Sequence, residues 1–135
     1  MIKTRSTKYV LAVQNFVGKQ SHVTNHDILI GLKADYPNLT ATTVHRVTDR
    51  LIKTNKLYLA PANYNNAMRF DSNLVAHDHF KCQNCDKLKD VKLPPSIVHQ
   101  LEKLIIGCKI NGSLTISGLC SNCFSKNDKK ERELI

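Results

Sequence analysis

The chain has no tryptophan, and aromatic residues make up only 6% of its 135 residues. Any core must therefore be built mainly from aliphatic side chains. No apolar run approaches the roughly 20 residues that span a bilayer. The basic start MIKTRSTKY leads into no apolar signal-peptide region. These absences predict a cytoplasmic protein with no membrane partner.

Cysteine is absent from the first 75 residues, and all five cysteines lie beyond that point. Thiols stay reduced in the cytoplasm, where paired CxxC motifs hold metal more often than they form disulfides. The pairs Cys82/Cys85 and Cys120/Cys123 supply the four thiolates that a tetrahedral zinc site needs. Their separation of 34 residues exceeds the usual zinc-ribbon spacing. We therefore predict a structural Zn²⁺ that joins distant ends of a small domain.

Other cysteine chemistry is less well supported. A thioredoxin-type redox role needs one CxxC pair at the start of a βαβ unit, and neither pair occupies that position. A zinc deaminase needs His-x-Glu and Pro-Cys-x-x-Cys motifs, which do not occur. The unpaired Cys108 follows an apolar helical stretch, and we expect it in the core.

The histidines His77 and His79 lie just before the first cysteine pair. Alternate residues of a strand point to the same side, so both imidazoles can meet one ion. A lone histidine is usually an ordinary hydrogen-bonded side chain. A His-x-His motif beside a zinc motif is a metal-ligand pair more often than a lone histidine is a ligand. The remaining ligands have to come from elsewhere in the chain.

The net charge is +9, from 20 basic and 11 acidic residues. Residues 1–75 hold 10 basic and 4 acidic groups, which is +6 of that total. A basic surface suits nucleic acid or an anionic membrane, but it is also compatible with a solvated basic face. Charge alone does not separate these interpretations.

The first half of the chain has helical periodicity. A first helix is expected to end at Gly18, a second to be capped by Asn25 and a third by Thr40. Residues 57–71 then have β-prone ends around a Pro-Asn-rich tip, as in a hairpin. Helix, helix, turn, helix and hairpin is the order of a winged helix-turn-helix.

The third helix, over residues 40–54, is expected to bury Val44, Val47 and Leu51. Arginine can bond guanine edges and threonine offers a methyl and a hydroxyl, so the opposite face suits base recognition. An ordinary amphipathic surface helix is the alternative, but the helix order and the basic excess favour DNA. The predicted DNA-binding residues are Thr42, Thr43, His45, Arg46 and Arg50.

The second half alternates differently. LKDVKL is expected to form a strand, PPSIVHQLEKLIIG a helix with proline in its first turn, and KINGSLTISG extended chain. We predict an α+β fold with a winged helix-turn-helix DNA-binding domain, residues 1–74. A small α/β dimerisation and metal-binding domain with the four-cysteine zinc site follows, residues 75–135.

Over residues 5–123 the sequence resembles the ferric uptake regulator (Fur) family of metal-dependent repressors. The matching stretches are SHVTNHDI, TATTVHRV, MRFD, HDHFKCQNC followed by KLKD, and SGLCSNC. The resemblance implies an N-terminal winged-helix domain and a C-terminal α/β dimerisation domain. It also implies a structural four-cysteine zinc and a regulatory metal at the hinge.

The resemblance implies a specific set of regulatory ligands. Three imidazoles and two carboxylates suit Fe²⁺ or Mn²⁺ better than Zn²⁺. Zinc-sensing members resemble this chain but have cysteine in place of Asp71, and iron-sensing members tend to use glutamate. Two aspartates are most similar to the peroxide-sensing branch, PerR. The implied ligands are His22, Asp71, His77, His79 and Asp90.

The chain also departs from the family pattern. A further family metal site is expected to be absent, because Ala76 and Gly112 stand where it uses histidines. The long helix that precedes the family's Arg-x-Thr motif is expected to be missing, and Tyr9-Val10 stands where the family has Gln-Arg after the motif. Both differences are expected to remove phosphate contacts. A tyrosine of the recognition helix is replaced by His45, and a glycine after the first CxxC by Asp86.

We therefore expect a homodimeric, metal-gated DNA-binding repressor that responds to peroxide and binds a palindromic operator, with His22 and His77 as the imidazoles that peroxide oxidises. One alternative is an iron- or manganese-responsive repressor of the same family without peroxide sensing. Another is a zinc-stabilised RNA- or protein-interaction module. An enzyme is not expected, because a metal hydrolase would need a separate general base that is not evident.

Overall fold

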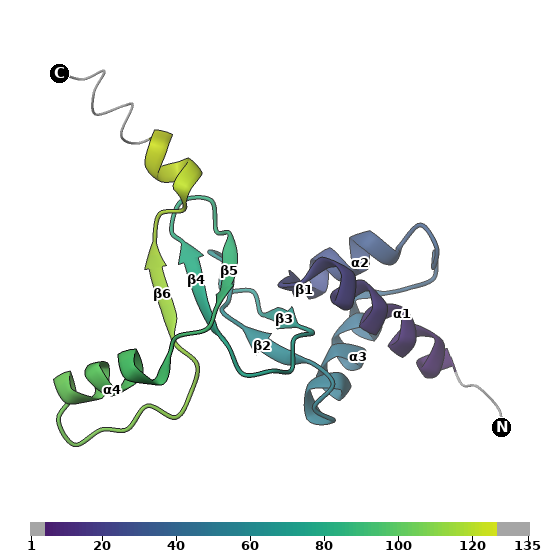
Figure 1. The fold of residues 1–135 in the computed structure, drawn as a ribbon. Helices are drawn as coiled ribbons and strands as arrows, with labels where there is room; N and C mark the ends of the chain where they lie inside the picture. Colours follow the sequence, from purple (N-terminus) through teal and green to yellow (C-terminus); the bar gives the residue numbers. More distant parts are fainter. Residues whose placement is uncertain (1–4, 127–135) are drawn as a thin grey trace. The chain divides into compact units, whose positions relative to one another are not determined.

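The computed structural model describes residues 5–126, and the chain divides into two compact units, Met1–Val75 and Ala76–Ile135. The elements of each unit are labelled in Figure 1. The first unit contains α1 (Arg5–Gln20), β1 (Val23–Thr24), α2 (Asn25–Leu32), α3 (Ala41–Lys53), β2 (Tyr58–Ala60) and β3 (Arg69–Asp71). The second unit contains β4 (Asp78–Cys82), β5 (Leu88–Val91), α4 (Pro95–Leu104) and β6 (Thr115–Gly118). Within residues 5–126, no helix has the length and apolar character to cross a membrane.

The core of the first unit is aliphatic, as the lack of tryptophan predicts. Helix α3 buries Val44, Val47 and Leu51, so the predicted inner face is confirmed. Phe70 of β3 is the one aromatic residue among the fully buried side chains of this described unit. The fully buried residues of the core include Val13, Val17, Ile28, Leu39, Val44, Leu57 and Phe70.

Two predicted helix boundaries in the first unit are wrong by one or two residues. Helix α1 continues past Gly18 to Gln20, because this glycine keeps helical geometry on the exposed side. Helix α2 is capped by Thr24 rather than by Asn25. The Thr24 hydroxyl accepts from the Asp27 N–H at 3.1 Å, and the Asp27 carboxylate accepts from the Thr24 N–H at 3.0 Å, which completes a capping box.

The cap of α3 and the following hairpin are confirmed. Thr40 accepts from the Thr43 N–H at 3.2 Å and so caps the helix. Strands β2 and β3 pair antiparallel around the Pro-Asn-rich tip, and β1 joins the other edge of β3. This is a winged helix-turn-helix unit. Because Val23 pairs with Phe70, the residues just outside that pair, 22 and 71, lie next to each other.

The second unit is a three-stranded sheet with the order β5-β4-β6. Strand β4 pairs antiparallel with β5 and parallel with β6, and α4 lies in the connection between β5 and β6. The helix has proline in its first turn, as predicted, but none of its residues is buried. The small α/β architecture is therefore as predicted, with one helix that lacks a covering partner within the described chain.

The buried apolar cluster of the second unit, in its described part, consists of Cys82, Cys120 and Cys123. Phe80 and Leu119 pack against it and are partly buried. A cluster this small gives little hydrophobic stabilisation, and small domains of this kind commonly depend on a metal or a disulfide. The prediction that Cys108 belongs to the core is wrong, because this residue is exposed.

Two helical glycines give a test of the packing in the first unit. Alanine at Gly18 would meet no atom within 4 Å, so Gly18→Ala should raise the unfolding free energy by about 0.5–1 kcal/mol through helix propensity. Alanine at Gly31 would overlap the ring of Phe16, so Gly31→Ala should lose that gain and destabilise the unit. Urea unfolding of both variants measures the difference. Equal stabilisation by both substitutions would contradict the contact between α1 and α2.

Candidate metal centres and nucleic-acid interface

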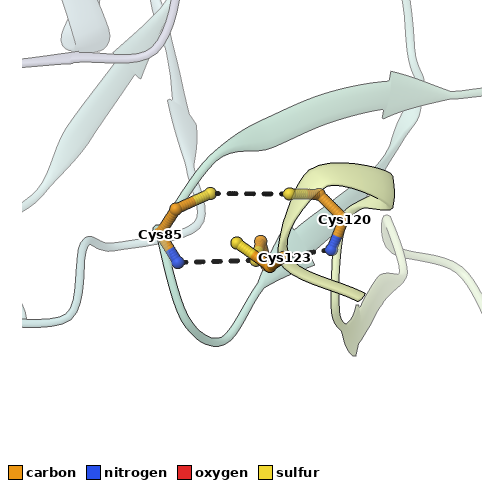
Figure 2. Close-up of side chains that lie close together, drawn as sticks. Cys85, Cys120 and Cys123 are labelled. Carbon is orange, nitrogen blue, oxygen red and sulfur yellow. Dashed lines mark hydrogen bonds between the residues drawn. The ribbon is translucent and has the colours of Figure 1, made fainter. Parts of the chain in front are cut away.

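Four cysteine side chains converge at one end of the second unit. Cys82 ends β4, and Cys85 lies in the turn that follows. Cys120 comes after β6, directly before helical residues 121–126, and Cys123 lies within them. The four Sγ atoms all lie within 4.8 Å of one another. Figure 2 shows Cys85 and Cys120 facing each other, with their Sγ atoms 3.7 Å apart.

The spacing of the sulfurs fits zinc. A tetrahedron with Zn–S bonds of about 2.3 Å has edges of roughly 3.8 Å, which is close to the distance between Cys85 and Cys120. The four donors are all sulfur, the set typical of closed structural zinc sites. The cluster is therefore consistent with a zinc site.

The thiols of the cluster differ in their ease of ionisation. Backbone N–H groups of Cys120 and Cys85 each donate to Cys82 Sγ at 3.4 Å and lower its pKa to about 6. For Cys85, a backbone hydrogen bond from Lys87 lowers the pKa. The hydrogen bonds to Cys82 and the other sulfurs, together with burial, outweigh it and raise the pKa to about 11. A divalent cation is thus needed for all four sulfurs to be thiolates together.

Local backbone structure shapes the first CxxC turn. Asp86 adopts a left-handed conformation with φ 67°, at the position where the resemblance to the family implies glycine. Its N–H donates to the Cys82 carbonyl at 3.0 Å and closes the turn. Sequence reasoning missed Asn84, whose side-chain amide donates to Cys123 Sγ at 3.3 Å and links the two pairs. Its position within the Cys-x-x-Cys motif is the only signal that points to it.

In the first unit, His22 and Asp71 form one donor pair. The Nε2 atom of His22 lies 3.4 Å from Oδ2 of Asp71, and both side chains are largely buried. The other carboxylate oxygen of Asp71 accepts from the Asn73 N–H at 2.9 Å, which leaves Oδ2 directed toward the imidazole. Ser21 and His22 both have positive φ, 55° and 51°. Non-glycine residues bear a cost of about 1–2 kcal/mol each in this conformation, which is often found at functional sites.

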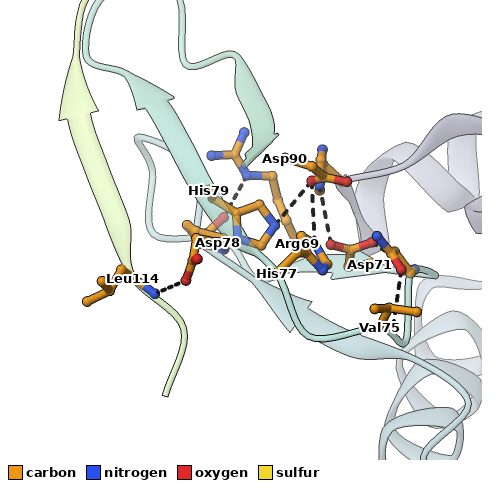
Figure 3. A network of polar contacts seen from close by, with 11 residues as sticks. Arg69, Asp71, Val75, His77, Asp78, His79, Asp90 and Leu114 are labelled. Carbon is orange, nitrogen blue, oxygen red and sulfur yellow. Dashed lines mark hydrogen bonds and ion pairs between the residues drawn. The ribbon is translucent and has the colours of Figure 1, made fainter. Parts of the chain in front are cut away.

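In the second unit, His77, His79 and Asp90 form another donor group, visible in Figure 3. The two imidazole rings have centroids 4.6 Å apart. Their Nε2 atoms lie 3.4 and 3.5 Å from the same oxygen, Asp90 Oδ1. His79 and Asp90 are paired across β4 and β5, so the sheet register sets their approach. Two imidazole nitrogens this close to one carboxylate oxygen match the donor set of a metal site with oxygen and nitrogen ligands.

Asp78 lies between these histidines, and sequence reasoning missed its role. Its two carboxylate oxygens accept from the N–H groups of Leu93, at 3.1 Å, and Leu114, at 2.9 Å. The bond to Leu114, drawn in Figure 3, is the main reason why the pKa of Asp78 is lowered. Asp78 therefore joins the chain segments that follow β5 and precede β6 to the start of β4. Its place in a His-x-His gives no signal for this role, because both partners are distant backbone groups.

The predicted DNA-binding residues lie on α3, where Thr42, His45, Arg46 and Arg50 are exposed and Thr43 is partly exposed. Arg46, Arg50 and Thr43 line a groove of about 760 Å³ together with three residues that sequence reasoning missed: Lys8, Tyr9 and Asn38. The Lys8 ammonium lies 5.1 Å from the centre of the Tyr36 ring, within range of a cation–π contact. A groove with three cations along a helix face suits a phosphate backbone.

The cysteine cluster predicts a defined loss. Cys82→Ser or Cys120→Ser should remove one zinc per chain and unfold the second unit, because binding of such an ion contributes about 10–16 kcal/mol to folding. Elemental analysis and circular dichroism measure both effects. Cys108→Ser is the matched control, since Cys108 is exposed and outside the cluster, and it should keep its zinc. Full zinc content in the Cys82 or Cys120 variants would contradict the assignment.

Solved structures share this fold. The Helicobacter pylori ferric uptake regulator Fur superposes with a TM-score of 0.71 at 20% identity, over 88% of this chain and 84% of that chain. The Campylobacter jejuni peroxide stress regulator superposes with a TM-score of 0.68 at 22% identity, over 88% of this chain and 91% of that chain. At these identities the likeness concerns the fold.

Sequence comparison identifies the family. The Peroxide operon regulator of Bacillus subtilis is 29% identical over 118 residues, which cover 86% of this chain and 81% of the relative. The model of the ferric uptake regulator family matches residues 3–112, most of the chain. Regulators of this family bind DNA and act as dimers. The chain therefore belongs to the ferric uptake regulator family of metal-dependent repressors.

Proposed function

We propose that the chain is a metal-gated repressor that releases its operator when peroxide oxidises a metal-binding histidine. The observation that carries the proposal is the pairing of imidazole and aspartate donors in each unit: His22 with Asp71, and His77 and His79 with Asp90. Such donors suit Fe²⁺ and Mn²⁺, whereas the thiolate cluster suits Zn²⁺. The chain thus carries two chemically distinct kinds of metal ligand.

The regulatory ion is proposed to be held by all five residues, His22, Asp71, His77, His79 and Asp90. The first two belong to one unit and the last three to the other. An ion that needs both groups favours the conformations in which both units can bind it. Metal affinity then becomes a preference for one arrangement of the units, which is what a population shift requires.

Operator binding is proposed to use α3 of both subunits of a homodimer. A two-fold dimer places its recognition helices one helical turn of DNA apart, which requires a palindromic operator. The exposed apolar side chains of the second unit support dimerisation there. Leu104 is 81% and Ile106 is 93% exposed at the end of α4. Apolar side chains at this exposure are better accommodated in an interface.

The peroxide response is supported by relatives. The Bacillus subtilis relative is a Peroxide operon regulator, and both regulatory carboxylates of this chain are aspartates. Bound Fe²⁺ would supply the electrons that cleave peroxide next to an imidazole. His22 and His77 are the proposed targets. An oxidised ring is a poorer ligand, so metal affinity falls and the operator is released. We propose no enzymatic turnover.

Metal-dependent DNA binding provides the first test. The Mn²⁺-loaded chain should select a palindromic site from random duplexes, and removal of the regulatory ion should abolish the selection. Arg46→Ala should reduce specific affinity about tenfold to a hundredfold if the guanidinium bonds a base edge. Lys53→Ala is the matched control. It removes the same charge from α3 at a residue that is ion-paired with Asp49, and it should leave the ratio of specific to non-specific affinity unchanged. Metal-independent binding would favour an RNA- or protein-interaction module instead.

Peroxide sensing has a separate test. Mass spectrometry of Fe²⁺-loaded protein after dilute peroxide should find one added oxygen on His22 or His77, and Mn²⁺-loaded protein should show none. Asp90→Glu lengthens one carboxylate arm without changing its charge, so metal binding should survive while oxidation falls. Asp35→Glu, an exposed residue of the first unit, serves as the control. If Fe²⁺ and Mn²⁺ forms bind DNA and survive peroxide equally, the chain is an iron- or manganese-responsive repressor without peroxide sensing.

A further inference from the structure

His45 of α3 is tied to the start of α2 by a side-chain contact. Its Nδ1 atom lies 3.2 Å from the amide nitrogen of Asn25, although the two residues are 20 positions apart in the chain. His45 is exposed, and both residues line a depression of about 430 Å³ beside the hairpin. An exposed side chain ordinarily samples several rotamers, so this contact restricts a ring that would otherwise be mobile.

The orientation of the Asn25 amide is set by a third residue. Thr48 is 1% exposed, and its hydroxyl oxygen lies 2.8 Å from Asn25 Oδ1 and 3.1 Å from the Val44 carbonyl. A hydroxyl has one proton, and the contact to Asn25 Oδ1 is shorter than those to the carbonyls of Val44, at 3.1 Å, and His45, at 3.2 Å, so we assign Asn25 Oδ1 as its acceptor. The amide oxygen of Asn25 therefore faces Thr48, and its NH₂ group faces His45.

The protonation of the imidazole follows from this chain of contacts. The NH₂ group of Asn25 is a donor only, so His45 Nδ1 has to accept from it. In a neutral imidazole, one nitrogen accepts and the other carries the proton. With the Asn25 amide in this orientation, the proton of a neutral His45 ring would lie on Nε2, and the ring would present an N–H donor from the exposed face of α3.

We propose that the chain Thr48–Asn25–His45 makes His45 a specificity-determining donor for a purine N7 in the major groove. This inference rests on the proposed function of α3 as a recognition helix. An N–H pairs with the acceptors of the major groove, which are purine N7, guanine O6 and thymine O4, and the amino groups of adenine and cytosine cannot pair with it. Of these acceptors, N7 is the one that guanine and adenine share. Asn25 and Thr48 are positioning residues. They order the ring before DNA arrives, which reduces the entropy lost on binding.

The tautomer can be measured without DNA. Nitrogen-15 NMR of the His45 ring in the full-length, metal-loaded protein at pH 8 should find the proton on Nε2. Asn25→Asp replaces the donor with a carboxylate that only accepts, so the proton should move to Nδ1. Thr48→Val leaves the Asn25 amide free to flip, so the His45 ring should be a mixture of the two tautomers. His26→Gln, next to Asn25 but outside the chain of contacts, should change nothing. A wild-type proton on Nδ1 overturns the proposal.

The second experiment measures base reading on the operator selected by the wild-type protein. Replacement of each purine in turn by its 7-deaza analogue removes one N7 acceptor. At one purine per half-site, this replacement should lower the affinity of the wild-type protein for the operator about tenfold. The same replacement should change the operator affinity of the His45→Ala and Asn25→Asp variants little. Each loss is taken as a ratio within one variant, so the added charge of Asn25→Asp cancels.

The outcomes separate this inference from the proposed function. If the metal-loaded wild type selects no operator, the proposed function fails, and the base-reading role fails with it. If it binds specifically but no purine is sensitive to 7-deaza replacement, or if His45→Ala keeps the same sensitivity, only the reading by His45 fails. If Asn25→Asp keeps the wild-type sensitivity, His45 reads the base but the positioning by Asn25 is overturned.

Discussion

The affinity of four sulfur atoms for one divalent cation is the interaction on which the second unit depends. The cysteines are also its buried core, with only Phe80 and Leu119 packed against them. The backbone N–H groups that lower the Cys82 pKa to about 6 favour one thiolate, but they leave Cys85 protonated near neutral pH. A cation removes this conflict, since it stabilises all four negative charges at once. The bound cation would thus stabilise the end of β4, the strand whose pairing with β5 positions His79 against Asp90.

A second constraint lies in the division of the imidazole–aspartate donors between the two units. His22 is held against Asp71 by a backbone with two consecutive positive φ angles, a costly arrangement that β1 and α1 maintain from either side. His77 and His79 are held by the sheet and by the two hydrogen bonds of Asp78. Each group is thus preorganised within its own unit. The proposed regulatory ion would act by binding both groups, so its free energy of binding is available to select an arrangement of the units.

Helix α3, the proposed recognition helix, would join these properties to DNA. Its inner face is fixed by the aliphatic core, and its outer face carries arginines beside a groove that also contains Lys8. At the position where the resemblance to the family implies tyrosine, His45 offers a ring whose hydrogen-bonding character depends on its tautomer. In our proposal, Asn25, the first residue of α2, and Thr48 on the buried side of α3 set that tautomer. The packing of α2 against α3 would thereby set which ring nitrogen of His45 carries the proton at the proposed DNA surface.

Much of this protein was determined by local sequence. The pairing of cysteines within each CxxC, the cap at Thr40, the inner face of α3 and the common side of His77 and His79 all follow from spacings of two to four residues. Tertiary structure decided what depends on distant segments. It left Cys108 exposed, because α4 has no covering helix in the described chain, and it gave the α2 cap to Thr24, whose backbone also pairs in β1. It also brought Asp78 to Leu114 and Asn25 to Thr48. These contacts join residues 36 and 23 positions apart, and no periodicity in a single sequence encodes a partner at that range.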